Sequence, residues 1–561
     1  MARAALLLAA AALLLAAAPR RAAGAYLQRP EQDCLNPMVQ KVNQFDFFPE
    51  EYRSIIDRPQ AGGLKATSTV TEAADFDIKY YGTYKVVRVK RFNKSYLLYQ
   101  CGTPDPATLP AGAAEGVTPG MASFEIPLYS VAVTDTTVNG FLSELNLIDR
   151  VALASPYSVE SCFQRLVDTK SQDGCKLVTP SPYFNKTDPG AEGRFRDANA
   201  TMYDKADAVF VGFSGDAAKD ILFPVTADPG PLNRAEWVKF VAAFFNKEVD
   251  ANAAFDSIKG TYNTLRQLVA TKNAEDDAEP RPSVAWVSTN ATGVSFRLDP
   301  YKVTLIKDAG GIPFNRSRVE SMGGVFSTNP LLGVSYVFVP KTADGLQALL
   351  KEADMIIDET YHIGIPSLAS IAKAFGLRNL GDAQAGLPAF QNQQVYRWDG
   401  EQSPTGSSSW FEMAVARPDW VLMDLARAIT PAVLADVLNV TNNIANKGPA
   451  GTDFNYLLQV DNKEDLGRPR VSAAKLCTTF PSCQDRSAFA ICPNVFRDCR
   501  TGRLMQADPT QRCNSWAVCE PVELDGGSGA SGRKSSGAQC PAAAAAATAA
   551  AALAAAALLA V

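Results

Sequence analysis

The chain has 561 residues, of which 47% are apolar and 20% charged, and its formal net charge at pH 7 is −5. This length predicts two to four domains, and the composition is that of a folded protein with a sizeable core. The acidic balance and the lack of a basic patch with interleaved aromatic residues argue against nucleic acid as a partner.

The first 25 residues are expected to be a secretory signal peptide. Arg3 precedes an apolar run over residues 4–18, and small residues at 23–25 supply a cleavage site. A signal anchor is the alternative, but the run is short. Residues 26–120 then contain β-prone runs and predict a small N-terminal β-rich extension, which Cys101 is in a position to staple.

Strands and helices alternate in the next segment, residues 121–232, which predicts an N-terminal α/β lobe. A polar insertion at about 160–200 carries Cys162 and Cys175, which are close enough in sequence to close a local loop. The expected strands are 130–134, 151–155, 207–211 and 223–225, with a helix over 136–148.

A long amphipathic stretch follows, and we expect residues 233–275 to form one helix between two lobes. Apolar residues recur at three-and-four spacing from residue 237 to 269, and no proline interrupts them. Asn233 followed three residues later by Glu236 has the pattern of a capping box.

Residues 276–435 repeat the alternation of strands and helices and predict a C-terminal α/β lobe. The fold class expected is therefore α/β, with two Rossmann-like lobes, each built on a parallel sheet, joined by a long helix. The expected strands are 283–287, 336–340, 354–357 and 394–398, and the expected helices begin at 299–300 or cover 343–352, 366–376 and 418–429.

The chain has eleven cysteines, and six of them crowd into residues 477–519 without CxxC spacing or a nearby histidine. Residues 436–524 therefore predict a disulfide-stapled module rather than a zinc site, with the pairing undetermined. A polar linker, 525–540, begins near small residues at 528–530 and precedes an apolar tail, 541–561. This pattern predicts a glycolipid anchor at the extracellular side of the plasma membrane, and a single transmembrane helix is the alternative. Six sequons fit a secreted glycoprotein: Asn93, Asn185, Asn199, Asn290, Asn315 and Asn439.

Catalytic motifs are missing from the sequence, so an enzyme is not expected. The only histidine is His362, and neither a GxSxG elbow nor a GxxxxGK[ST] phosphate loop occurs. No catalytic residue, metal site or catalytic cofactor is predicted.

Aromatic residues follow the predicted strands, at positions where loops of the two lobes would converge. Such side chains, with a few polar groups, suit the walls of a small-molecule site, although each taken alone is also consistent with core packing. The candidate ligand-binding residues are Tyr157, Phe213, Phe296, Tyr361, His362, Ser409, Trp410, Phe411 and Glu412.

Residues 126–430 resemble the helical-backbone (class III) family of periplasmic substrate-binding proteins, which serve cobalamin, siderophore and haem uptake. The order lobe, long helix, lobe is similar. The run Trp410-Phe411-Glu412, followed by Ala416-Arg417-Pro418, resembles a Trp-Phe-Glu-Arg-Ala-Ser-Pro run in the bacterial vitamin B12-binding protein. That loop opens with an aspartate at the corrin edge, where this chain has Ser409. The secreted and anchored setting is most similar to the algal cobalamin acquisition proteins.

The resemblance implies a cell-surface protein that captures cobalamin between its lobes and passes it to a membrane transporter or an endocytic receptor. In this interpretation Ser409 and Glu412 bond the amide edges of the ligand, and Tyr361 or His362 closes the cleft. The walls are Tyr157, Phe213, Phe296, Trp410 and Phe411. Two alternatives stay open: an iron-siderophore or haem receptor of the same fold, and an anchored ectodomain whose cysteine-rich module binds a protein partner.

Overall fold

The computed structural model describes residues 67–431, except 82, 104, 110–111, 113, 168–177, 182–186, 276–279 and 362–365. It also describes residues 454–460 and 477, and the backbone of short strands nearer the ends. The expected signal peptide, the anchor region, most of the cysteine-rich segment and His362 lie outside these residues. The short strands are β1 (Val42–Asn43), β2 (Asp46–Pro49), β20 (Arg470–Val471), β21 (Val495–Asp498), β22 (Leu504–Gln506) and β23 (Val518–Pro521).

A four-stranded sheet precedes the first lobe, in the order β3-β4-β5-β6. It packs against the first lobe through Phe76, whose ring centroid lies 4.9 Å from that of Trp237. The last strand runs parallel to its neighbour, whereas the other pairs are antiparallel. The strands are β3 (Phe76–Tyr80), β4 (Tyr84–Val89), β5 (Lys94–Gln100) and β6 (Ala122–Ile126), with the short η2 (Pro106–Thr108) between β5 and β6.

The N-terminal lobe contains an all-parallel sheet in the order β10-β9-β7-β8. Its central strands are apolar and buried along their whole length, as expected where helices cover both faces of a parallel sheet. The elements are β7 (Val131–Val133), η3 (Thr136–Val138), α3 (Asn139–Glu144), η4 (Ile148–Arg150), β8 (Val151–Leu153), α4 (Ser161–Val167), α5 (Ala191–Lys205), β9 (Ala208–Val211), β10 (Asp220–Leu222) and η5 (Val225–Ala227).

The stretch predicted as one long helix is instead three helices: α6 (Pro231–Ala235), α7 (Trp237–Ala243) and α8 (Glu248–Glu275). Every residue of α7 is buried, so α7 belongs to the core of the N-terminal lobe. The chain turns at Asn246, whose φ of 54° is a left-handed conformation that asparagine tolerates better than most residues. The expected uninterrupted helix over 233–275 is therefore wrong in its first third.

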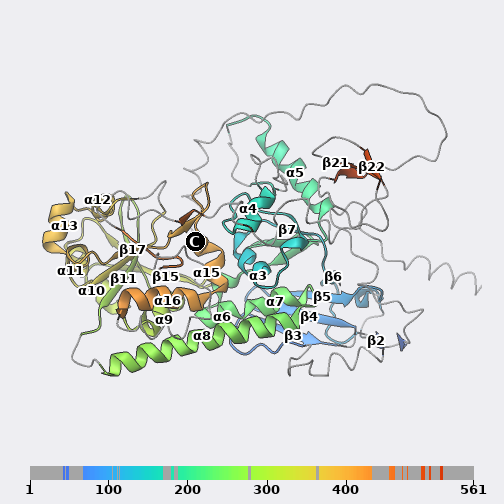
Figure 1. Cartoon of the computed structure of the whole chain (residues 1–561), viewed down its shortest axis with the longest axis horizontal. Helices are drawn as coiled ribbons and strands as arrows, with labels where there is room; N and C mark the ends of the chain where they lie inside the picture. Colours follow the sequence, from blue (N-terminus) through green and yellow to red (C-terminus); the bar gives the residue numbers. More distant parts are fainter. Residues whose placement is uncertain are drawn as a thin grey trace, which may run out of the picture.

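Helix α8 is nevertheless the element that joins the lobes (Figure 1). Its 28 residues span about 42 Å at 1.5 Å per residue. Phe255 and Ile258 pack into the core of the N-terminal lobe, whereas Tyr262, Leu265 and Val269 pack into a core of the C-terminal lobe. One face of a single helix thus passes from one core to the other within about one turn.

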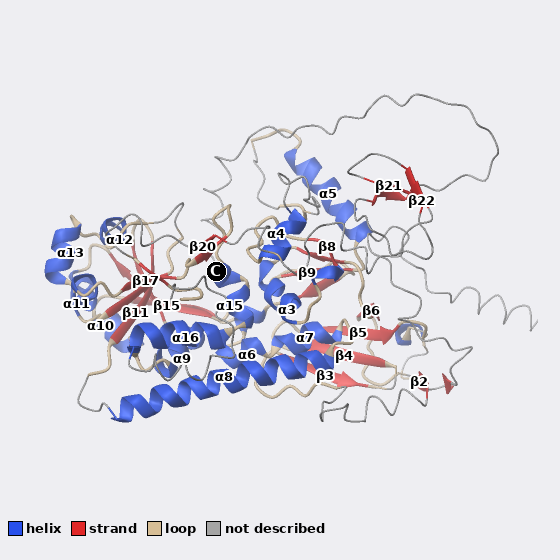
Figure 2. Cartoon of the chain, viewed as in Figure 1, coloured by secondary structure: helices blue, strands red, loops and turns tan. Residues whose placement is uncertain are grey.

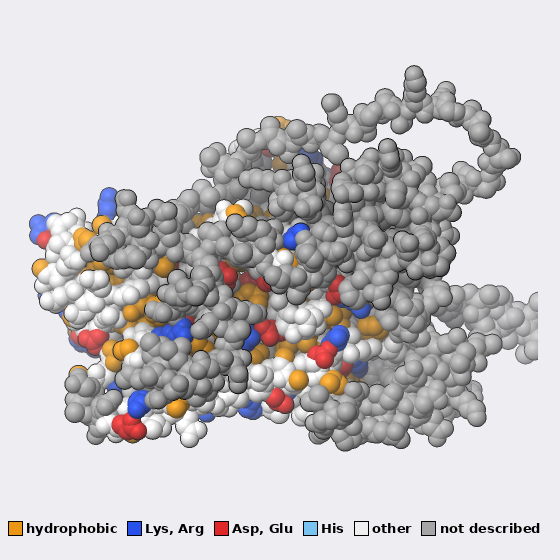
Figure 3. Space-filling view, in the orientation of Figure 1, with side chains coloured by type: hydrophobic (Ala, Val, Ile, Leu, Met, Phe, Trp, Pro, Cys, Tyr) orange, Lys and Arg blue, Asp and Glu red, His pale blue; other side chains and the backbone are white. Residues whose placement is uncertain are grey.

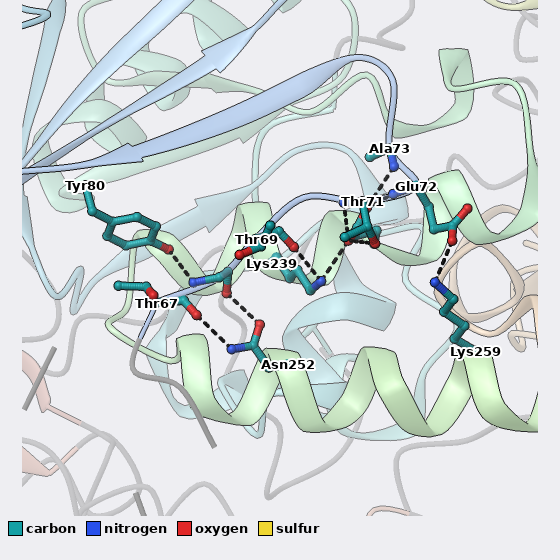
Figure 4. Close-up of polar contacts among 11 residues, drawn as sticks. Thr67, Thr69, Thr71, Glu72, Ala73, Tyr80, Lys239, Asn252 and Lys259 are labelled. Carbon is teal, nitrogen blue, oxygen red and sulfur yellow. Dashed lines mark hydrogen bonds and ion pairs between the residues drawn. The ribbon is translucent and has the colours of Figure 1, made fainter. Parts of the chain in front are cut away.

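The expected capping box at Asn233 is also absent, because Glu236 binds a different part of the chain. Both oxygens of this fully buried carboxylate accept hydrogen bonds from the backbone N–H groups of Thr71, Glu72 and Ala73, at 2.6–3.0 Å. Lys239 pairs with it at 2.7 Å. Figure 4 shows the segment 67–73 held along α7 and α8 by these and neighbouring contacts.

The C-terminal lobe is built on a mixed sheet rather than the parallel sheet expected, in the order β14-β15-β12-β11-β16-β17-β19 with β13 beside β11. Only three residues separate β11 from β12, which is too short for a parallel crossover, so the pair is antiparallel. Figure 2 shows helices on both sides of these strands. The strands are β11 (Ser283–Thr289), β12 (Gly293–Arg297), β13 (Ile312–Pro313), β14 (Val325–Asn329), β15 (Val334–Pro340), β16 (Met355–Asp358), β17 (Val395–Arg397) and β19 (Leu458–Gln459).

The helices of this lobe follow the predicted alternation closely, and α16 has the expected bounds. They are α9 (Pro300–Asp308), α10 (Arg316–Ser321), α11 (Asp344–Lys351), α12 (Leu368–Ala374), α13 (Leu380–Gly386), α14 (Pro388–Gln391) and α16 (Pro418–Ile429). Strand β18 (Glu401–Gln402), η6 (Ser409–Phe411) and α15 (Met413–Ala416) lie between β17 and α16. Among the described helices, none combines the length and the apolar character needed to cross a membrane.

The disulfide pairing corrects a sequence expectation. Cys162, in α4, is bonded to Cys477 and not to Cys175. Cys477 is 5% exposed and lies within the core of the N-terminal lobe. The chain that leaves the C-terminal lobe therefore returns to the first lobe, and Cys477 does not belong to a self-contained cysteine module.

Candidate functional site

A second connection between the lobes is formed by residues 408–417, which we call the crossing segment. Figure 1 shows its helix, α15, between the two sheets. The helix packs on α3 so closely that a Cβ on Gly140 would lie 3.0 Å from the backbone oxygen of Glu412 and 3.1 Å from the Cβ of Ala416. Arg417 extends the junction with an ion pair to Glu144 at 3.3 Å.

The side chain of Glu412 holds the two lobes together. Its Oε2 accepts the backbone N–H of Val159 at 2.7 Å, and its Oε1 accepts that of Glu160 at 2.9 Å. Both donors belong to the loop that follows β8 in the N-terminal lobe. Since Glu412 is fully buried and both its oxygens are engaged, the structure gives it a role in joining the lobes rather than the expected bond to a ligand.

Burial raises the pKa of Glu412 to about 8, although the N–H groups of Glu160 and Val159 and the side chain of Asn139 oppose the shift. The carboxyl is therefore mostly protonated at neutral pH. Asn139 donates from Nδ2 to Ser158 Oγ at 3.1 Å, while its Oδ1 is buried and accepts no hydrogen bond.

Three tryptophans stack beside the crossing segment. The ring of Trp398 lies 4.7 Å from that of Trp286 and 4.0 Å from that of Trp410, and the latter two are 5.8 Å apart, so each ring contacts both others. Trp410 is only 8% exposed, so most of its ring packs in this stack. The indole N–H of Trp398 and the hydroxyl of Ser409 are buried and have no hydrogen-bond partner.

Charged residues at the carboxyl ends of β16 and β17 are paired with one another. Arg397 contacts Asp358 at 2.6 Å and Asp399 at 2.8 Å, and it is 3% exposed. Burial alone would lower the pKa of Arg397, but these two carboxylates raise it. The sequence analysis missed this cluster, although an arginine within a predicted strand was a signal for it.

A second buried cluster surrounds Glu359, one residue beyond β16. Lys302 and Arg297 lie 2.8 and 3.0 Å from its oxygens, and the indole N–H of Trp286 donates at 3.0 Å. Burial by itself would raise the pKa of Glu359, but the two cations hold it below its ordinary value. The charges at these strand ends are thus balanced internally.

The other predicted site residues lie farther apart than expected. Tyr157 is half-buried near the carboxyl end of β8, where its hydroxyl lies 2.9 Å from Ser181 Oγ. Phe213 is half-buried after β9, with its ring 6.2 Å from that of Phe92. Phe296 lies inside β12 rather than in a loop, and it is 1% exposed because it packs in the core of the C-terminal lobe.

Two predicted aromatic residues are accessible. Phe411, in the crossing segment, is 44% exposed, and Tyr361, three residues beyond β16, is 43% exposed. His362 lies outside the described residues. The structure therefore brings Ser409, Trp410, Phe411 and Glu412 to the junction between the lobes, near the loop that contains Tyr157.

Comparisons with known proteins were made by sequence and by structure. No family model matches the chain. A stretch of 87 residues is 36% identical to an uncharacterized lipoprotein of Methanocaldococcus jannaschii, and it covers 14% of this chain and 19% of that protein. The chain thus matches about a fifth of the length of that relative.

Several solved structures are similar to part of this chain. Helicobacter pylori CeuE with Ni(II) bound is 12% identical, with a TM-score of 0.35, over 58% of this chain and 93% of that chain. A periplasmic heme-binding protein from Pseudomonas aeruginosa is 12% identical, with a TM-score of 0.35, over 54% and 94%. The petrobactin-binding protein YclQ from Bacillus subtilis is 13% identical, with a TM-score of 0.35, over 55% and 92%.

Proposed function

We propose that the protein is a substrate-binding protein that captures a small molecule at the junction of its two lobes and carries out no chemistry on it. One observation carries this proposal: loops at the carboxyl ends of strands from both lobes meet the crossing segment. The loop after β8 binds Glu412, and Trp398, directly after β17, stacks on Trp410. Ligands of open α/β sheets bind where such strand ends converge.

Cobalamin is our first candidate for the ligand. Two of the predicted aromatic side chains are accessible, Phe411 in the crossing segment and Tyr361 beyond β16, and such rings suit a large ligand with apolar faces. The cations at the strand ends, Arg397 and Lys302, already have carboxylate partners. An anionic ferric siderophore would need free cations, so this pairing favours a less charged ligand.

The experiment is a calorimetric titration of the secreted protein with cyanocobalamin, a ferric siderophore and haem. Phe411→Ala should weaken binding about tenfold or more, because the aromatic face contributes on the order of 1 kcal/mol beyond its buried area. Ile312→Ala is the control. Ile312 is also exposed, at 45%, but it lies at the amino end of the sheet of the C-terminal lobe.

If an iron chelate binds instead of cobalamin, the proposed site stands and the ligand is the iron chelate. Failure to bind any of the three, with a folded protein, would contradict the proposal and favour an ectodomain that binds a protein partner.

We also propose that the protein acts at the extracellular side of the plasma membrane. The apolar N-terminal run, the small triplet at 528–530 and the apolar tail support secretion followed by a lipid anchor. A bound solute would then need a membrane transporter or an endocytic receptor to enter the cell. Release of the protein from cells by a phospholipase that cleaves glycolipid anchors tests this proposal.

A further inference from the structure

A cavity of about 440 Å³ lies at the far end of α8, remote from the crossing segment. One wall is a face of the last turns of α8, which includes Arg266 and Asn273. The other wall contains Arg281, just before β11, and Lys307 and Asp308, at the end of α9. Figure 1 shows this end of α8 at the left of the molecule, away from α15.

The position of the cavity separates it from the proposed solute site. Arg281 lies two residues before Ser283, where β11 begins. The cavity is therefore at the amino end of this strand, whereas the crossing segment meets loops at the carboxyl ends. A ligand in the cavity would not contact the lobe junction.

Three of the lining side chains, Arg266, Arg281 and Lys307, are cations, and none of them lies within ion-pair distance of a described carboxylate, although the charges of Arg266 and Lys307 act on Asp308 and oppose the burial that raises its pKa. Among the described lining residues the only acid is Asp308, whose Oδ2 accepts the hydroxyl of Tyr262 at 2.7 Å. The formal charge of the lining is therefore 3 − 1 = +2, on a chain whose net charge is −5.

Other cations of the same lobe show that this arrangement is unusual for the protein. Arg297, Arg316, Arg318 and Arg397 each lie within ion-pair distance of a carboxylate. Unpaired cations gathered around a concave site, in a protein that pairs most of its neighbouring arginines, indicate a place for an anion from outside the chain.

We propose that this cavity binds a small oxyanion, such as a molecule that carries a phosphate or sulfate group. The planar guanidinium groups of Arg266 and Arg281 suit two-point hydrogen bonding to such a group, and Asn273 adds a neutral amide donor. The C-terminal end of a helix carries partial negative charge, so α8 contributes through its side chains and not through its backbone. The cavity is partly open, and its volume is within the range of small-ligand sites, which favours a discrete anion over a flat membrane surface.

The test compares the full secreted protein in phosphate, sulfate and chloride at equal ionic strength, by calorimetry and thermal unfolding. Phosphate or sulfate should raise the unfolding temperature above that in chloride, because a ligand that binds only the folded state stabilises it. The double variant Arg266→Ala/Arg281→Ala should bind the oxyanion at least about tenfold more weakly, since it loses the charged hydrogen bonds of two guanidinium groups.

The matched control is Lys351→Ala/Lys373→Ala, which removes two exposed cations from the same lobe at positions that do not line the cavity. This variant should keep the affinity of the native protein. Equal losses in both double variants, equal stability in all three salts, or binding to anionic lipid vesicles but not to free phosphate would each overturn the proposal. Cyanocobalamin binding should be unchanged in Arg266→Ala/Arg281→Ala, so this test is independent of the solute site.

Discussion

Glu412 and Val159 are 253 residues apart in the sequence, and a hydrogen bond of 2.7 Å joins them across the boundary between the lobes. A further contact lies at the turn between β14 and β15. There a Cβ on Gly333 would lie 2.7 Å from the backbone oxygen of Ala227, and Arg91 donates to the backbone oxygen of Pro330. With α8 and these contacts in place, we expect a small hinge motion on ligand binding rather than a wide closure.

Replacing Glu412 should destabilise the protein in proportion to the acceptors that are lost. Glu412→Ala leaves two buried N–H groups unpaired, at a cost of about 1–3 kcal/mol each, and Glu412→Gln leaves one. The free energy of unfolding in urea should therefore fall in the order native, Glu412→Gln, Glu412→Ala. Glu352→Ala is the control, because that carboxylate pairs with Arg318 near the surface and should change stability little. A Glu412→Ala protein as stable as this control would contradict the prediction.

The stability of the protein should decrease as the pH rises from 6 to 8. In the folded state the pKa of Glu412 is about 8 rather than the ordinary 4.5, so the folded protein keeps a proton that the unfolded chain releases in this range. One retained proton makes the free energy of unfolding fall by at most about 1.4 kcal/mol per pH unit.

Urea unfolding of the native protein and Glu412→Gln at several pH values measures this effect. The pKa of Asp424 is raised only to about 6, so its contribution is small above that pH. The variant should show a flatter dependence between pH 6 and 8. Identical slopes for the two proteins would show that Glu412 is ionised in the folded state.

Two glycine substitutions should have opposite effects. Gly140→Ala places a methyl group 3.0 Å from the backbone of Glu412, so we expect a loss of about 1–3 kcal/mol and weaker ligand binding. Gly260→Ala, on α8, meets nothing within 4 Å and should stabilise the protein by about 0.5–1 kcal/mol through its helix propensity. Thermal unfolding of the two variants tests the pair, and equal effects would mean that α3 and α15 are not in close contact.

Peptide mapping without reduction should recover a cross-linked pair that contains Cys162 and Cys477. The double variant Cys162→Ala/Cys477→Ala should be less stable by about 2–5 kcal/mol, since the bond closes a long loop in the unfolded chain. Recovery of a peptide that joins Cys162 to Cys175 would instead support the local loop expected from sequence.

Much of the fold was predictable because each element carries its own periodic pattern. Local residues alone predict the bounds of α16, the end of α9 at Gly310, and the buried strands β7 and β9. The break before α8 was not predictable in this way. Apart from Lys239, residues 237–245 are all apolar, so the helical period continues through the turn at Asn246 and shows no boundary.

The sequence singled out the crossing segment, but not the contacts that its residues make. Trp410 and Glu412 belong to the motif that carried the resemblance, and both lie at the junction. The partners of Glu412 are backbone N–H groups of Val159 and Glu160, and a backbone group leaves no signature in the sequence. Phe296 was misplaced because the hairpin of β11 and β12 puts it inside the sheet.

The passage of α8 from one core to the other also bears on how the molecule melts. Ile258 and Tyr262 are one turn apart, yet they belong to different cores. If one lobe unfolded, the half of α8 that packs in it would lose its tertiary contacts and fray. This fraying would destabilise the adjacent contacts of the other half. The two lobes, although separate in architecture, should therefore unfold cooperatively in a single calorimetric peak.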